Sequence, residues 1–193
     1  MTKTKICMAL VGLWAFAITG QTVAQTYPAK PIRLIVPFAP GGSSDTLARA
    51  LSQRLGEVVG QSIVIENRGG AGGAIGAELA ARSPADGYTV FFTTNGPITV
   101  NQSLHKKLAY NSLKDFAPIT VIASLPSLLV VHPSLPVKSV KDLIALAKSK
   151  PGQLTYSSGG AGASNHLGAE LFKVMAGVDL VHVPYKGGGP AVI

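Results

Sequence analysis

Val36-Pro37-Phe38-Ala39-Pro40-Gly41-Gly42-Ser43-Ser44-Asp45 is the stretch of sequence that decides the fold. An apolar, β-branched strand leads into this stretch, and a helix whose leucines recur every fourth residue leaves it. The prolines and glycines prevent the strand from continuing and the helix from beginning early. Ser43, Ser44 and Asp45 are expected to supply the N-cap chemistry of the helix. We therefore expect a tight loop whose backbone N–H groups form a site for an anion.

Strands and helices alternate along the rest of the first half. The sequence predicts strands at residues 32–36, 62–66 and 88–93, with helices between them that end at Gly60 and Arg82. A second glycine-rich loop, at residues 67–73, follows the second strand. This alternation is typical of a parallel sheet with right-handed crossovers, so the predicted fold class is α/β.

The second half repeats this plan. The predicted helices lie at residues 102–108, 139–150 and 166–176, and Pro190 is expected to begin another. The predicted strands lie at residues 116–124, 127–131, 154–157 and 179–183. Glycine-rich loops follow the last two strands, so we expect two lobes of similar winding, lobe I at residues 25–124 and lobe II at residues 125–193.

The repeated plan has a consequence for binding. Ligands of open α/β sheets lie outside the carboxyl ends of the strands, where both Gly/Ser loops are predicted. Two facing lobes would bring two helix N-termini to one cleft, and that cleft could grip a two-ended acid at each end.

The first 24 residues read as a secretory signal peptide. Lys3 and Lys5 precede an apolar run of residues 6–18, which is too short to span a bilayer as a stable helix, and small residues end at Ala24. We expect cleavage after about Ala24 and a periplasmic location; an uncleaved anchor is the alternative. Beyond the leader the chain has no cysteine, so an exported domain of this sequence relies on its core and hydrogen bonds.

Composition and motifs argue against several other classes of protein. The formal net charge is +8, but no run of five basic residues occurs, so nucleic-acid binding is not expected. The glycines at 70, 72 and 76 follow the second strand and have the wrong spacing for a dinucleotide fingerprint, and no P-loop motif occurs. The four histidines lack metal-ligand spacing. No cofactor and no metal are expected.

An exported α/β hydrolase is the rival prediction. Ser43 or Ser164 would be its nucleophile, and Ser158 also lies in a glycine loop. None of these serines lies in a G-x-S-x-G motif, and only Ser164 has a histidine nearby in sequence, His166. A serine that caps a helix or donates to a ligand explains the pattern better.

Several motifs together resemble one family. The stretch at residues 31–45, Val64-Ile65-Glu66-Asn67-Arg68-Gly69-Gly70 and Asp86-Gly87-Tyr88-Thr89 resemble the Bug/TctC substrate-binding proteins of tripartite tricarboxylate transporters. Lys114-Asp115-Phe116-Ala117-Pro118 and Val181-His182-Val183-Pro184-Tyr185-Lys186-Gly187 continue the likeness in order, to the last residue.

The resemblance implies a two-lobed periplasmic-binding-protein type II-like fold that closes on a small carboxylate. The loops at residues 38–45 and 158–166 would hold the ligand carboxylates through backbone amides, hydroxyls and water, and residues 94–95 and 185–186 would line the cleft. The ligand-binding residues that it implies are Phe38, Gly42, Ser43, Ser44, Asp45, Thr94, Asn95, Ser158, Gly159, Ser164, Asn165, His166 and Tyr185.

The functional expectation is a non-catalytic, monomeric receptor. It would capture a small anionic organic acid, such as a di- or tricarboxylate, and deliver it to the membrane permease subunits of a tripartite transporter. Family members are longer, so the resemblance also implies a second lobe that is incomplete in this chain. A nonfunctional truncated receptor is therefore a further alternative.

Overall fold

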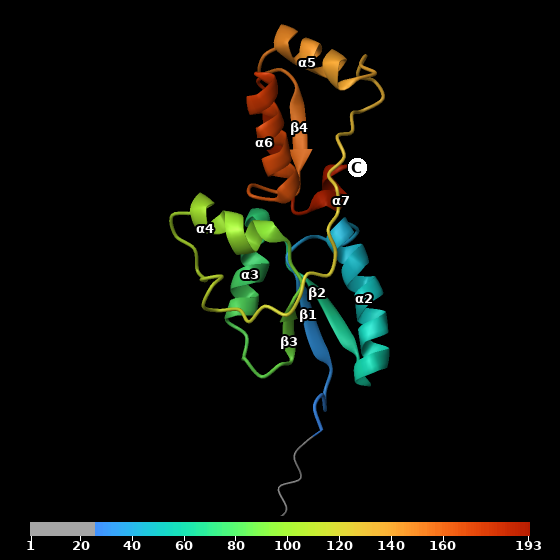
Figure 1. Cartoon of the computed structure of the whole chain (residues 1–193), viewed down its shortest axis with the longest axis vertical. Helices are drawn as coiled ribbons and strands as arrows, with labels where there is room; N and C mark the ends of the chain where they lie inside the picture. The colour runs from blue at the N-terminus through green and yellow to red at the C-terminus, as the bar shows by residue number, and fades with distance from the viewer. Residues whose placement is uncertain (1–25) are drawn as a thin grey trace, which may run out of the picture.

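The computed structural model describes residues 26–193, and these form two α/β lobes joined by a long extended segment (Figure 1). The predicted signal peptide lies outside the described residues. No helix within residues 26–193 is both long and apolar enough to cross a membrane.

Lobe I is built on a three-stranded parallel sheet. Its strands are β1 (Ile32–Val36), β2 (Ile63–Asn67) and β3 (Thr89–Phe91), in the order β2-β1-β3. The central strand is almost completely buried, as its apolar sequence predicts for a strand covered on both faces. The predicted α/β class with parallel sheets is confirmed.

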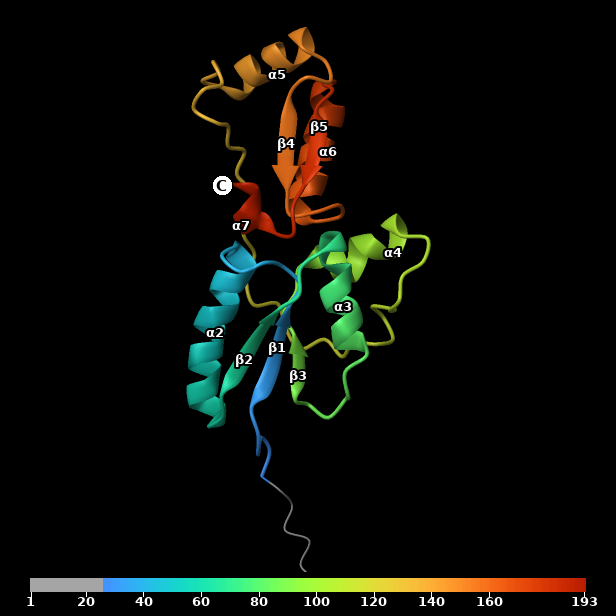
Figure 2. The same ribbon diagram turned by 180° about the vertical axis from the view of Figure 1, so that it is seen from behind.

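Two helices cover the two faces of this sheet (Figure 2). On one face α2 (Ser43–Val59) brings Ala48 against Leu34 and Val36, which are 2% and 0% exposed. On the other face lies α3 (Ala74–Ala81), which follows a short 3-10 turn, η2 (Ala71–Gly73). Both crossovers begin at the carboxyl ends of strands, so the two glycine-rich loops of lobe I lie at one edge of the sheet.

Two predictions in the middle of the chain are wrong. Helical structure begins at Gly96 with η3 (Gly96–Val100) and ends with α4 (Asn101–Leu104), whereas the sequence predicted a helix at 102–108. Pro97 in the first helical turn explains the early start, because its fixed φ suits that position. Residues 116–131 form no strand at all, although two were predicted.

The strands are missing because no strand within residues 26–193 pairs with this segment. Residues 116–131 run extended between the lobes, and large side chains such as Val121 and Leu128 are more than four-fifths exposed. A β-branched, apolar composition favours a strand only where another strand completes its hydrogen bonds. The boundary predicted between residues 124 and 125 falls inside this segment and stays a prediction.

Lobe II repeats the arrangement on a smaller scale. Its sheet has two parallel strands, β4 (Thr155–Ser158) and β5 (Val181–Pro184). Its helices are α5 (Val140–Ser149), α6 (Ser164–Ala176) and the short α7 (Gly188–Ala191). Ala147, Val178 and Leu180 form its core, with Phe172 of α6 packed against them.

One lobe II helix begins earlier than expected. Pro190 is the third residue of α7, which begins at Gly188, so it does not start the helix as predicted. In α6, Leu171 and Val174 are mostly exposed because no element within residues 26–193 covers them. The predicted helix at 139–150 is present as α5, and its N-cap is Ser139, whose hydroxyl oxygen accepts from Asp142 N–H at 3.1 Å.

Candidate functional site

Loops from both lobes meet at one interface between β1 and β4 (Figures 1 and 2). The Ala39 N–H of lobe I donates to the Lys186 carbonyl of lobe II at 2.9 Å. On another side of the interface, the Ser164 hydroxyl donates to the Asn95 side-chain oxygen at 2.7 Å. Because each bond joins residues from different lobes, the two lobes are in direct contact here.

Glycines make this close approach possible. A Cβ atom at Gly72 would lie 1.8 Å from the Ala161 carbonyl oxygen, and one at Gly96 would lie 2.7 Å from the Gly162 carbonyl oxygen. Both distances are shorter than any tolerated contact of a side chain. The glycine-rich composition of these loops therefore lets backbone meet backbone across the interface.

The N-terminus of α2 lies at this interface without a side-chain cap. Its N-cap residue is Gly42, and no side chain accepts from the first turn, so the N-cap role predicted for Ser43, Ser44 and Asp45 is wrong. Glycine at the N-cap leaves the N–H groups of those three residues without a partner among residues 26–193. These groups and the helix dipole are suited to an anion.

Asp45 has a different role from the one predicted. Its carboxylate is 4% exposed and accepts from the Gly41 N–H at 3.0 Å, from Arg49 at 2.9 Å and from the Asn67 amide at 3.1 Å. These donors, Arg49 first, hold the pKa of Asp45 below its usual value against the opposing effect of burial. Both carboxylate oxygens are thus occupied by the protein, and Asp45 shapes the loop from inside.

The loop at residues 158–166 of lobe II, which we call the grip loop, is also held by its own side chains. Asn165 accepts from the Gly159 N–H at 3.1 Å, and His166 Nδ1 accepts from the Gly162 N–H at 3.2 Å. The Ser158 hydroxyl oxygen accepts from the Gly160 N–H at 3.1 Å. Three predicted ligand-binding side chains therefore use acceptor atoms to fix the backbone of the loop.

This bonding leaves the N-terminus of α6 available. Its N-cap residue, Ala163, has no side-chain acceptor, and the first backbone bond of the helix is from Leu167 N–H to the Ala163 carbonyl. The N–H groups of Ser164, Asn165 and His166 have no partner within residues 26–193. The interface thus holds a second uncapped helix N-terminus, from the other lobe.

The remaining predicted site residues lie at or near the same interface. Thr94 Oγ1 is buried and has no hydrogen-bond partner among the described residues. Phe38 is buried, and its carbonyl accepts from Asn67. Gly42 and Gly159 both approach the backbone of Gly188, and the Tyr185 N–H donates to the Ser158 carbonyl at 2.9 Å.

Sequence reasoning missed His182. Its Nε2 lies 2.6 Å from the Ser158 hydroxyl, and its ring stacks on Tyr156 and lies tilted against His166, with centroid separations of 4.9 and 4.3 Å. The position of His182 follows from the pairing of β4 with β5, which places Tyr156 and His182 opposite each other. Parallel pairing of the two strands would have pointed to a contact between these side chains.

The serines do not form a catalytic arrangement. Ser164 is bonded to Asn95, and Ser43 has no histidine partner among residues 26–193. Ser158 has His182 beside it, but the serine is 0% exposed and its oxygen already accepts from Gly160. Within the described residues, no cluster of three histidine, cysteine or acidic side chains could hold a metal.

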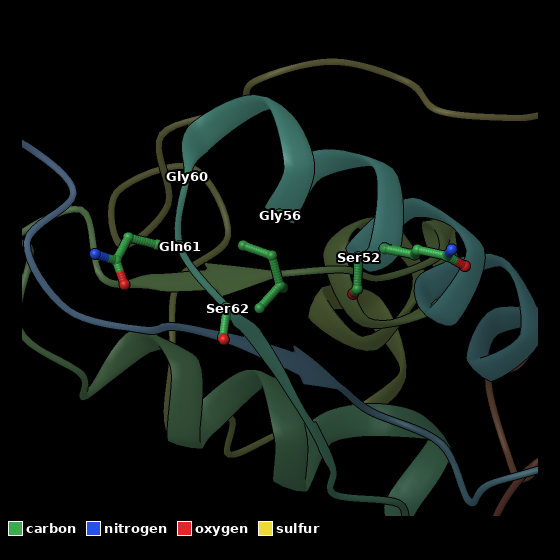
Figure 3. Close-up of a pocket in the computed structure, with 7 residues that line it drawn as sticks. Ser52, Gly56, Gly60, Gln61 and Ser62 are labelled. Carbon is green, nitrogen blue, oxygen red and sulfur yellow. The ribbon is translucent and has the colours of Figure 1, made fainter.

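A separate hollow of about 540 Å³ lies at the far end of α2 (Figure 3). It is lined by Ser52, Gln53, Gly56, Gly60, Gln61, Ser62 and Ile63. It is open and has no charged side chain, and the C-terminus of a helix carries the negative end of the dipole. The hollow is therefore unsuited to an anion and stands apart from the interface.

Comparison with known proteins places these features in a family. The family described as "Tripartite tricarboxylate transporter family receptor" matches residues 47–193. Protein BugT of Bordetella pertussis is 40% identical to the chain over 196 residues, which is all of this chain and 60% of BugT. The chain spans 48–60% of the length of the six curated relatives that match most of it.

Solved structures of related proteins support the same family assignment. The structure of R. palustris Rpa4515 with adipate is 45% identical, with a TM-score of 0.83 over 86% of this chain and 56% of that chain. MatC (Rpa3494) from Rhodopseudomonas palustris with bound malate is 32% identical, with a TM-score of 0.81 over 86% of this chain and 56% of that chain. The predicted resemblance is confirmed: the chain belongs to the TctC family of tripartite tricarboxylate transporter receptors.

Proposed function

We propose that this chain carries the gripping loops of a periplasmic receptor that captures a small dicarboxylate between its lobes. The observation that carries the proposal is the pair of uncapped helix N-termini, one from α2 of lobe I and one from α6 of lobe II, at a single interface. Each offers free N–H groups and a positive dipole end to one carboxylate.

The geometry of the interface supports binding of the ligand through backbone N–H groups. The interface is formed by glycine loops, and no arginine or lysine side chain forms an ion pair across it within residues 26–193. The unpartnered Thr94 hydroxyl and the Tyr185 ring are additional polar groups for the ligand. Both adipate and malate, named with the two solved relatives, have a carboxylate at each end.

The proposal extends to the cellular role. The family is one of receptors of tripartite transporters, and the predicted leader would send the chain to the periplasm. We propose that a monomeric receptor passes the captured acid to membrane permease subunits, with closure of the lobes trapping the ligand. We expect no catalysis, so p-nitrophenyl esters should not be turned over above the rate of a Ser164→Ala variant.

A thermal-shift and calorimetric series tests the binding proposal. Adipate and malate should raise the unfolding temperature, since a ligand at 100 times its dissociation constant stabilises the native state by about 2.7 kcal/mol. Hexanoate, which matches adipate but lacks one carboxylate, and 1,6-hexanediol, which lacks both, should give a much smaller shift. Equal shifts from adipate and hexanoate would contradict a two-ended grip, and no shift from any dicarboxylate tested would defeat the proposal for this chain.

A further inference from the structure

A pair of side chains from the two strands of lobe II holds the backbone of the grip loop. Ser158 ends β4 and is 0% exposed, and His182 lies on the adjacent strand β5. Ser158 Oγ is 3.1 Å from the Gly160 nitrogen and 2.6 Å from His182 Nε2. One hydroxyl thus links the backbone of the loop to the histidine.

We assign the direction of these hydrogen bonds from their distances. The Ser158 oxygen accepts from the Gly160 N–H, and its own proton is donated to His182 Nε2 in the tautomer that carries the imidazole proton on Nδ1. We assign this tautomer because the other acceptor near the hydroxyl, the Gly160 carbonyl, is 3.4 Å away and offers a weaker bond than Nε2 at 2.6 Å. In this assignment His182 is the acceptor that orients the serine.

The surroundings of His182 favour its neutral form. Tyr156 of β4 stacks on its ring, His166 of α6 lies tilted against it, and Glu170 and Lys173 of α6 are the charged groups that face it. Burial lowers the pKa of His182 from its usual value, His166 and Lys173 lower it further, and Glu170 opposes them. Near neutral pH the imidazole is thus uncharged and can accept a proton from Ser158.

We infer that His182 is a positioning residue for ligand capture, which acts through Ser158 to hold Gly160 and thereby the direction in which α6 presents its free N–H groups. This inference rests on the proposed function, because it names a device within the same site. His182 itself does not touch the ligand. When His182 is protonated, Nε2 becomes a donor, and the Ser158 hydroxyl must turn to the distant Gly160 carbonyl. The loop is then held less firmly, and affinity falls in acid.

Three single variants and one double variant of the chain test the inference. His182→Phe keeps an aromatic ring in contact with Tyr156 and His166 but removes the acceptor, and we expect about tenfold weaker adipate binding at pH 7.5. His182→Gln offers an uncharged acceptor near the Nε2 position and should restore binding to within about twofold. Ser158→Ala should match His182→Phe, and the double variant should be no weaker than either single one, because the two residues form one unit.

The pH profile separates positioning from a purely structural role. Adipate binds less well in acid as it gains protons, but this change is the same for the wild type and His182→Gln. We expect the ratio of their affinities to shift by about threefold to tenfold against the wild type between pH 7.5 and pH 5.0. A constant ratio, additive losses in the double variant, or wild-type affinity in His182→Phe would each overturn the inference.

Amide hydrogen exchange gives a readout that needs no ligand. The Gly160 amide should exchange more slowly in the wild type and in His182→Gln than in His182→Phe or Ser158→Ala. Equal exchange in all four proteins would overturn the role of His182. If exchange follows this order while the wild type binds neither adipate nor malate at pH 7.5, the proposed function fails, and His182 is shown to hold the loop but not to serve capture of these acids.

Discussion

The Ser164 hydroxyl donates a hydrogen bond to the side-chain oxygen of Asn95 at 2.7 Å, although 69 positions separate the two residues. Asn95 follows β3 of lobe I, and Ser164 is the first residue of α6 in lobe II. Both were predicted from the sequence as ligand-binding residues. We therefore expect the proposed lobe closure and the proposed ligand grip to depend on the same groups.

Removing this bond should weaken ligand capture. Ser164→Ala loses one hydrogen bond between the lobes, which is worth about 0.5–1.5 kcal/mol, so adipate affinity should fall by about twofold to tenfold in calorimetry. Ser149→Ala is the matched control, because the Ser149 hydroxyl donates to the Leu146 carbonyl within α5, away from the interface. Equal affinities of the two variants would contradict a role for the bond between the lobes.

A methyl group at Gly72 should keep the lobes apart. Gly72→Ala would place Cβ 1.8 Å from the Ala161 carbonyl oxygen, so the loops cannot meet and ligand affinity should fall at least tenfold. Gly177→Ala is the control, since Gly177 has the same φ of 60° but nothing within 4 Å of its Cβ position. Both variants incur the same backbone strain of about 1–2 kcal/mol.

Small-angle scattering separates steric blocking from strain. With adipate present, the Gly72→Ala variant should have a larger radius of gyration than the Gly177→Ala variant. If the two variants have the same radius and the same affinity, backbone strain alone explains the loss at Gly72, and the close approach across the interface is not required.

Asp45 should make stability depend on acid pH. The folded-state pKa of Asp45 lies below its unfolded value, so its contribution is fully present above the unfolded value of about 3.8 and is lost as pH falls through the folded one. Asp45→Asn should cost about 1–3 kcal/mol at pH 7, because the carboxylate accepts from Gly41, Arg49 and Asn67.

Urea unfolding at pH 7 and pH 2.5 checks this prediction. The difference between the wild type and Asp45→Asn should shrink at the lower pH. Glu57→Gln is the control, because among residues 26–193 Glu57 pairs only with the exposed Arg54. This substitution should change the unfolding midpoint little at either pH. A difference for Asp45→Asn that is the same at both pH values would show that its charge is unimportant.

Substitutions in the lobe I core and in the extended segment at residues 116–131 should differ greatly in their effect on the free energy of unfolding. Leu34 is 2% exposed at the centre of the lobe I core, so Leu34→Ala should lower the free energy of unfolding by about 2–5 kcal/mol. Leu128 is 84% exposed, so Leu128→Lys should change stability by less than about 0.5 kcal/mol and improve solubility. A large loss from Leu128→Lys would mean that residues 116–131 pack against something in solution.

The elements that sequence predicted well are those fixed by local physics. The strand at Ile32–Val36 is a continuous apolar run, and the helix after it is delimited by Gly42 and by Gly60 in the left-handed conformation. The cap by Ser139 was also predictable, because N-caps are set by a few adjacent residues. Where a feature required a distant partner, as at residues 116–131, prediction failed.

The features of the candidate site likewise fall into those that the sequence predicts and those that depend on the tertiary structure. The sequence by itself determined that glycine and serine loops follow parallel strands, so it predicted two helix N-termini that are suited to an anion. Only the tertiary structure decided which groups are free to bind. It placed Asp45 inside its loop, paired Ser158 with His182, and joined Ser164 to Asn95, because hydrogen bonds between residues far apart in sequence depend on how the strands pair and how the lobes meet.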